Sequence, residues 1–194
     1  MREDVASAAA AIEAGELVVY PTETVYGLGA DALATAAVEA VYELKGRSRE
    51  KPLSLGVPDV DAALEYTHPT AREERFMREF LPGPVTVVVE RADCVPDVLT
   101  AGKDRVGVRI PDHDLARELL ERAGPITATS ANRSGNPSVR HPEQLDRRIR
   151  SGVSVVIDGG TTPGTESTVV DPGEGIVHRR GARAEAIEAW LREQ

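Results

Sequence analysis

The sequence predicts an α/β fold, in which a single domain holds a twisted, mixed β-sheet flanked by helices. Short runs of Val, Ile and Leu, of strand length, alternate with segments whose apolar residues recur at helical spacing. No repeat, low-complexity stretch or linker divides the 194 residues. We therefore expect one domain that spans residues 1–194.

The first half of the chain alternates helix and strand. Asp4 can cap a helix over residues 5–14, and Gly15 can end it. Pro69 separates two further helices, and Pro82, Gly83 and Pro84 form a rigid turn before a strand. The predicted strands are 17–20, 52–57 and 85–90, the predicted helices are 5–14, 34–44, 59–65 and 70–80, and 21–29 is predicted to be a polar loop.

The second half continues the alternation, with strands becoming more frequent toward the end. Pro111 and Asp112 open a helix, and Pro172 with Gly173 makes the turn of a hairpin. The predicted strands are 105–110, 126–129, 153–158, 167–170 and 175–178, the predicted helices are 115–122, 142–149 and 184–192, and 94–100 is predicted to be a loop or short turn.

Composition excludes several classes of protein. No apolar run reaches the roughly 18 residues of a membrane-spanning helix, and the acidic N-terminus does not resemble a signal peptide. Cys94 is the single cysteine, so an internal disulfide is excluded, and we expect a cytoplasmic location. The net charge of −9 opposes non-specific binding of nucleic acid.

Four cations occupy every second position of residues 45–51. In an extended segment Lys45, Arg47, Arg49 and Lys51 would point to one side, where they could hold nucleotide phosphates. The alternative is a solvated charged loop. Of the 23 basic residues only Lys45, Lys51 and Lys103 are lysine, which indicates that Lys45 and Lys51 need an ammonium, and we expect Lys45 in an exposed cleft.

Common catalytic and binding motifs are absent or weak. Residues 27–32 match GxGxxA, but six residues separate them from the preceding strand, which argues against a dinucleotide site. There is no P-loop, HExxH, CxxC or GxSxG, and the four histidines are scattered, so a metal site built only from protein ligands is not expected. Polar segments instead follow several predicted strands, and we expect them to meet at one edge of the sheet.

Seven segments, in order, resemble the YrdC-like domain family. They are YPTETVYGLGADA, KGRSREKPL, PGPVT, VGVRIPDH, TATSANRSG, GTESTVVD and RRG. The resemblance covers about residues 5–191. It implies a twisted α/β sheet with a basic concave ligand-binding face, in the short form of the family that lacks an extra C-terminal domain.

The resemblance also implies an activity, that of a threonylcarbamoyl-AMP synthase. This nucleotidyltransferase joins L-threonine, bicarbonate and ATP into threonylcarbamoyl-AMP and releases pyrophosphate, for the threonylcarbamoyladenosine modification of tRNA. Mg²⁺ is expected to arrive with ATP, and a downstream threonylcarbamoyl-transferase complex is the expected partner, with weak binding of tRNA. Two alternatives stay open: a double-stranded RNA or tRNA-binding module without synthase activity, and a sister enzyme that forms a different carbamoyl adenylate.

The motif positions imply roles for individual residues. Gly56 takes the place of a histidine in some relatives, so it could contact threonine only through its backbone. Glu23 is a candidate outer-shell ligand of Mg²⁺. The implied catalytic residues are Lys45, Arg47, Ser130 and Asn132; those for ATP are Arg47, Lys51, Thr86, Ser130, Asn132 and Arg179; and those for threonine are Thr24, Gly56, Arg109 and Ser167.

Overall fold

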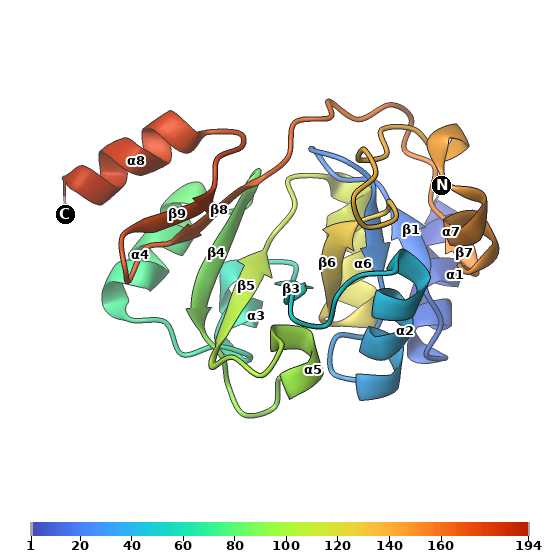
Figure 1. Cartoon of the computed structure of the whole chain (residues 1–194), viewed down its shortest axis with the longest axis horizontal. Coiled ribbons are helices and arrows are strands. Elements are labelled where there is room, and N and C mark those ends of the chain that lie inside the picture. The colour runs from blue at the N-terminus through green and yellow to red at the C-terminus, as the bar shows by residue number, and fades with distance from the viewer. Residues whose placement is uncertain (1, 194) are drawn as a thin grey trace.

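The computed structural model describes residues 2–193, and it is organised around one nine-stranded sheet (Figure 1). The strand order is β7-β1-β2-β6-β3-β5-β4-β8-β9. The strands are β1 (Val18–Tyr20), β2 (Gly27–Gly29), β3 (Ser54–Gly56), β4 (Val85–Glu90), β5 (Arg105–Arg109), β6 (Ile126–Ser130), β7 (Val155–Val156), β8 (Thr168–Asp171) and β9 (Ile176–Arg179).

The sheet is mixed, as predicted. Parallel pairing joins β1 to β7, β3 to β5 and β4 to β8, and the other neighbours run antiparallel. Parallel pairs need a crossover connection, and helices supply it between β3 and β5. The predicted α/β class with a mixed sheet is therefore confirmed.

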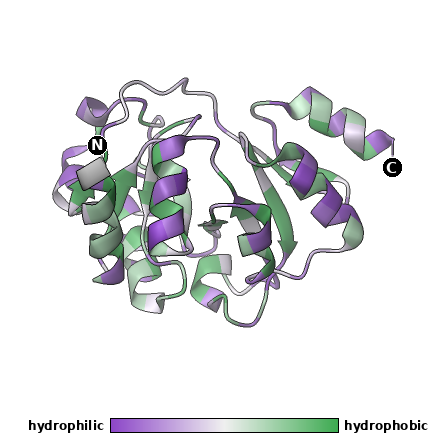
Figure 2. Cartoon of the chain, turned by 180° about the vertical axis from the view of Figure 1, so that it is seen from behind, coloured by the Kyte–Doolittle hydropathy of each residue, from purple (hydrophilic) through white to green (hydrophobic). Residues whose placement is uncertain are grey.

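Helices lie in front of the sheet and behind it (Figure 1), and those seen from behind turn hydrophilic positions outward (Figure 2). Within residues 2–193 every helix is too short or too polar to cross a membrane. The helices are α1 (Arg2–Glu13), α2 (Thr35–Lys45), α3 (Val60–Leu64), α4 (Ala71–Phe80), α5 (Asp97–Thr100), α6 (Asp114–Ala123), α7 (Arg147–Ser151) and α8 (Ala184–Arg192), with a 3₁₀ turn η1 at Pro142–Gln144.

Four details differ from the sequence prediction. Helix α1 begins before Asp4, and α5 forms one helical turn inside the predicted loop 94–100. The predicted helix 142–149 breaks into η1 and α7, because the Asp146 carboxylate caps a new helix by accepting from the Arg148 N–H at 2.8 Å. The predicted loop 21–29 ends in a strand, β2, whose glycines let the Tyr20 ring pack directly on the backbone: a Cβ at Gly27 would lie 2.6 Å from Tyr20 Cζ.

The central strands divide their residues between two faces. In β5, Val106 and Val108 are buried in the core, whereas the intervening positions and both ends point to the opposite face. In β4, Val85, Val87 and Val89 are buried in the same core. Because successive side chains of a strand alternate, the other face of these strands is available to carry Thr86 and Arg109.

A buried ion-pair cluster ties helix α4 to this sheet. One terminal nitrogen of Arg105 donates to Glu73 Oε1 at 2.7 Å and to Asp171 Oδ1 at 2.8 Å, and both carboxylate side chains are 2% exposed. Burial alone would raise the pKa of Glu73, but hydrogen bonds from the Thr70 N–H and from Arg105 outweigh it and lower that pKa. The cluster therefore stabilises the fold in the ionised form of Glu73.

This cluster predicts an acid-dependent loss of stability. Since the pKa of Glu73 is lower in the folded chain, its contribution is present above the unfolded value of about 4.3 and is lost as pH falls further. Glu73→Gln should lower the free energy of unfolding by about 2 kcal/mol at pH 7. Urea unfolding at pH 7 and at pH 3.5 checks this, and an equal loss at both pH values would contradict it.

Candidate active site

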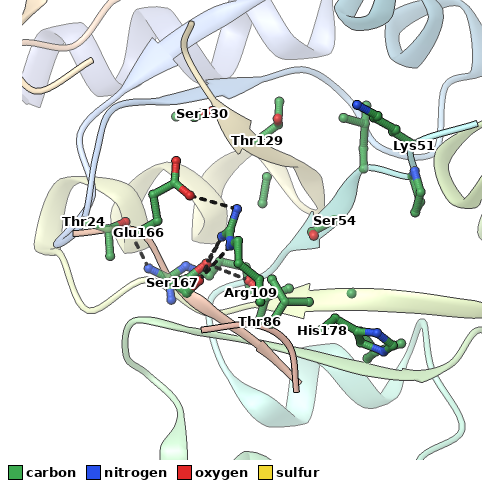
Figure 3. A pocket seen from close by; sticks show the side chains of 18 of the residues that line it. Thr24, Lys51, Ser54, Thr86, Arg109, Thr129, Ser130, Glu166, Ser167 and His178 are labelled. Atoms are coloured by element: carbon green, nitrogen blue, oxygen red, sulfur yellow. Dashed lines mark hydrogen bonds and ion pairs between the residues drawn. The ribbon is translucent and has the colours of Figure 1, made fainter. Parts of the chain in front are cut away.

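A cavity of about 1000 Å³ lies over the polar face of the central strands. Figure 3 shows Thr24, Arg109 and Ser167 on one side of it, and Lys51 and His178 on the other. Of the residues implied by the family resemblance, eight line the cavity: Thr24, Arg47, Lys51, Thr86, Arg109, Ser130, Ser167 and Arg179. The structure thus brings together residues that are up to 155 positions apart in the sequence.

Arg109, at the end of β5, holds one side of the cavity together. One of its terminal nitrogens donates to the carbonyl oxygens of Gly83 and Val85, the latter at 3.0 Å. The other donates to Glu23 Oε1 at 2.7 Å and lies 3.4 Å from Thr24 Oγ1. Burial lowers the pKa of Arg109, and the neighbouring Glu23 carboxylate opposes that shift. The guanidinium is therefore already paired before any ligand binds.

Ser167 is the centre of a second group of polar side chains. Its hydroxyl lies 3.2 Å from Thr86 Oγ1 and accepts a hydrogen bond from Arg179 at 2.9 Å. Arg179 also donates to the Ser167 carbonyl and lies 3.3 Å from Glu166 Oε2. The Glu166 carboxylate in turn accepts from Ser138, so this group links β9, the segment before β8 and the loop after β6.

The segment of alternating cations is not extended, which contradicts the prediction of one cationic face. Helix α2 continues to Lys45, and Gly46 then adopts a left-handed conformation with φ of 60°, which turns the chain. Arg49 pairs with Glu39 at 2.8 Å on the outer side of α2. Arg47 and Lys51 do line the cavity, and Arg47 braces the turn by donating to the carbonyl oxygens of Lys51 and Pro52.

Lys45 is buried, with 2% of its surface exposed, and does not lie in the exposed cleft that we predicted. Its ammonium donates to the carbonyl oxygens of Ser130 and Asn132, the latter at 2.7 Å. Burial, with a smaller contribution from Arg47, lowers the pKa of Lys45 to about 7. Lys45 is therefore positioned to hold the loop after β6, and it is not among the residues that line the cavity.

Asn132 and Gly56 are also absent from the described residues that line the cavity. The Asn132 amide nitrogen donates to the carbonyl oxygens of Arg133 and Asn136, so it closes its own loop, and its Oδ1 is buried without a partner among the described residues. Gly56 pairs with Arg109 of β5 and with Ile126 of β6, so its backbone is enclosed by both neighbouring strands.

Several lining residues were missed by the sequence reasoning. Arg105 and Asp171 reach the cavity because β5 and β8 present alternate positions to it, and His178 reaches it from β9, the edge strand that pairs with β8. Lys103 could have been noticed, since it is the third of the three lysines. Glu166 lies in the polar segment GTESTVVD, which indicated a functional loop but not which side chain would pair with a cation.

The charge of the cavity is nearly balanced. Six cations (Arg47, Lys51, Lys103, Arg105, Arg109, Arg179) and four carboxylates (Glu50, Glu166, Asp171, Glu174) line it. Among the described residues, no three His, Cys, Asp or Glu side chains are grouped closely enough to hold a metal ion. The six cations give the cavity groups that can bind an anion.

Because Lys45 is buried, we predict that replacing it with arginine will destabilise the fold. Lys45→Arg should lower the free energy of unfolding by about 1–3 kcal/mol, because a larger planar group must fit in a filled site. Lys51→Arg is the matched control at an exposed position and should change stability by less than about 0.5 kcal/mol. Urea unfolding measures both, and equal stability of the two variants would rule out a tightly packed Lys45.

The lowered pKa of Lys45 predicts a further dependence of stability on pH. Between pH 7 and the unfolded lysine value of about 10.4, the unfolded chain binds more protons than the folded chain. The contribution of Lys45 to stability should therefore rise with pH across this window. Comparing the parent with Lys45→Met from pH 7 to 10 checks this, and parallel curves for the two proteins would contradict it.

The sequence is similar to known proteins over most of its length. The family model Sua5/YciO/YrdC, described as telomere recombination, matches residues 10–181. The chain is 40% identical over 197 residues to a threonylcarbamoyl-AMP synthase of Bacillus subtilis, covering 96% of this chain and 56% of the relative. It is 42% identical over 171 residues to the threonylcarbamoyl-AMP synthase of Pyrococcus abyssi, covering 84% of this chain and 49% of the relative. The chain thus spans about half the length of these curated relatives.

Solved structures show the same fold. Sua5 of P. abyssi in complex with L-threonine superimposes with a TM-score of 0.87 and 39% identity, covering 94% of this chain and 56% of that chain. E. coli YciO superimposes with a TM-score of 0.84 and 25% identity, covering 94% of this chain and 91% of that chain.

Proposed function

This chain belongs to the Sua5/YciO/YrdC family, and we propose that it is a threonylcarbamoyl-AMP synthase. In the proposed reaction L-threonine, bicarbonate and ATP give threonylcarbamoyl-AMP, pyrophosphate and water. The observation that carries the proposal is that eight residues implied for ATP and threonine line one cavity. The name of two relatives, and the threonine bound to P. abyssi Sua5, support the choice of substrate.

Threonine and ATP would meet where β4 pairs with β5. Thr86 of β4 is the register partner of Arg109 of β5, and its hydroxyl faces Ser167. Arg109, Thr24 and Ser167 would hold threonine, whereas Thr86 and Arg179 would hold ATP. Reactants bound there are adjacent, which is the main requirement of a reaction that needs positioning and charge stabilisation.

The chemistry has two steps. The threonine amine first loses a proton and adds to the carbon of bicarbonate, which becomes a carbamate with loss of water. A carbamate oxygen then attacks the α-phosphorus of ATP, and the bond from that phosphorus to the bridging oxygen of pyrophosphate breaks. Negative charge collects on the departing pyrophosphate, so cations beside it would lower the barrier.

The structure changes the roles that we propose for the implied catalytic residues. Arg47 and Ser130 line the cavity and would contact the reactants, the former at ATP phosphates. Lys45 would act as a positioning residue, because its ammonium holds the backbone of Ser130 and Asn132. For Asn132 to contact ATP, its loop would have to move, since its amide nitrogen is engaged within that loop.

The proposed reaction also needs a metal ion and a partner that uses the product. Mg²⁺ would be bound through the triphosphate and water, and it would offset phosphate charge when bound. Glu23 would contribute to an outer shell of Mg²⁺ only through Oε2, which has no partner among the described residues, because its Oε1 pairs with Arg109. A downstream threonylcarbamoyl-transferase complex and a cytoplasmic location are proposed from the same family membership.

The test is product analysis with a matched pair of amino acids. Incubation with ATP, Mg²⁺, bicarbonate and threonine should yield threonylcarbamoyl-AMP by mass spectrometry. Valine, which has nearly the shape of threonine but lacks its hydroxyl, should react at least about 100-fold more slowly, because buried polar groups of the site would stay unpaired. Thr24→Val should reduce that discrimination, since Thr24 lies beside Arg109 in the proposed threonine site.

Two results would contradict the proposal. Equal turnover of threonine and valine would show that Thr24 and Ser167 do not recognise the hydroxyl. Absence of any adenylate product, together with tRNA affinity that falls steeply with salt, would favour the RNA-binding module instead.

A further inference from the structure

The arginines of the cavity are already engaged by the protein. Arg105, Arg109 and Arg179 each pair with a carboxylate, at 2.7, 2.7 and 3.3 Å respectively. In the described part of the chain Arg47 pairs with no carboxylate, and it donates to two backbone carbonyl oxygens. These side chains are held in place, and a ligand that used the three paired arginines would share or displace their carboxylates.

The two lysines of the cavity are different. Over residues 2–193, the side-chain ammonium of neither Lys51 nor Lys103 has a hydrogen-bond or ion-pair partner, although both residues line the cavity. Both are exposed. They are therefore the cavity cations whose side chains are available to an incoming anion without loss of an existing contact.

The backbone around each lysine is fixed in the same manner. The Lys51 carbonyl oxygen accepts from Arg47 Nε at 3.1 Å, and the Lys103 carbonyl oxygen accepts from Arg91 Nε at 3.0 Å. The turns that carry the lysines are joined by a hydrogen bond from Leu53 N–H to the Leu99 carbonyl oxygen at 2.8 Å. Two free ammonium groups are thus presented to the cavity from neighbouring, firmly held turns.

Composition supports a specific need at these positions. The chain uses arginine for 20 of its 23 basic residues, yet two of its three lysines line this cavity. The third, Lys45, donates to the carbonyl oxygen of Ser130, which also lines the cavity. An ammonium is a compact charge on a flexible stem, whereas a guanidinium is a rigid fork. A flexible cation suits a group that must be bound, neutralised during reaction and then released.

We propose that Lys103, together with Lys51, binds the β- and γ-phosphates of the nucleotide and stabilises the pyrophosphate as it leaves. This assignment rests on the proposed synthase function and extends it to a residue outside the seven motifs that carry the family resemblance. The nearby Arg105 would contribute little charge, because Glu73 and Asp171 pair with it. Glu50 and Glu174 also line the cavity and would favour a phosphate group that arrives with Mg²⁺.

The test measures binding without turnover, by calorimetric titration of two probes, inorganic pyrophosphate with Mg²⁺ and AMP. Lys103→Met should weaken pyrophosphate binding by about 10-fold, the loss expected for one charge-assisted hydrogen bond, and should leave AMP binding unchanged. Arg49→Met is the matched control: it removes one exposed cation beside Lys51 that pairs outside the cavity, and it should affect neither probe.

The outcomes separate this inference from the proposed function. If Lys103→Met binds pyrophosphate within about twofold of the parent, or if it weakens AMP equally, the assignment of Lys103 is wrong even in an active synthase. If the parent forms no threonylcarbamoyl-AMP but loses pyrophosphate affinity on Lys103→Met, the proposed function fails and the phosphate site stands. A thermal melt should show that both variants fold like the parent, since both side chains are exposed.

Discussion

The need to neutralise one buried cation, Arg109, shapes much of this structure. A guanidinium removed from water must be fully paired, and here it draws in three separate segments: the turn before β4, the loop after β1 and β5 itself. Glu23 pairs with it, and the next residue, Thr24, is thereby set at the wall of the cavity. The site is thus built around an interaction that also contributes to the tertiary fold.

The second organising feature is the alternation of side chains along β4, β5 and β8. Alternate valines of these strands pack into the core, and the intervening positions, which include Thr86, Arg109 and Asp171, face the cavity. Because β4 pairs with both β5 and β8, Thr86 is brought between Arg109 and Ser167. Close spacing in the site therefore follows from strand register, and a shift by one residue would turn these side chains into the core.

The cavity combines arginines that are bound by protein oxygens with lysines whose ammonium groups have no partner among the described residues. Its arginines are fixed by carboxylates and carbonyl oxygens, which gives the walls a defined shape and leaves little excess charge. Its two lysines extend from braced turns without partners among the described residues. A site that must orient one anion and release another benefits from both kinds, because rigid groups position a reactant and flexible ones exchange it readily.

The sequence by itself determined the fold class, the order of most elements and the family, because hydrophobic periodicity and ordered motifs are local properties of the chain. It also placed most of the site residues in polar loops. Only the tertiary structure decided that Lys45 is buried under the loop after β6, that Arg49 faces away, and that Lys103 reaches the cavity. Those outcomes depend on where helix α2 ends and on contacts between distant segments such as Leu53 and Leu99, and no spacing along the chain encodes them.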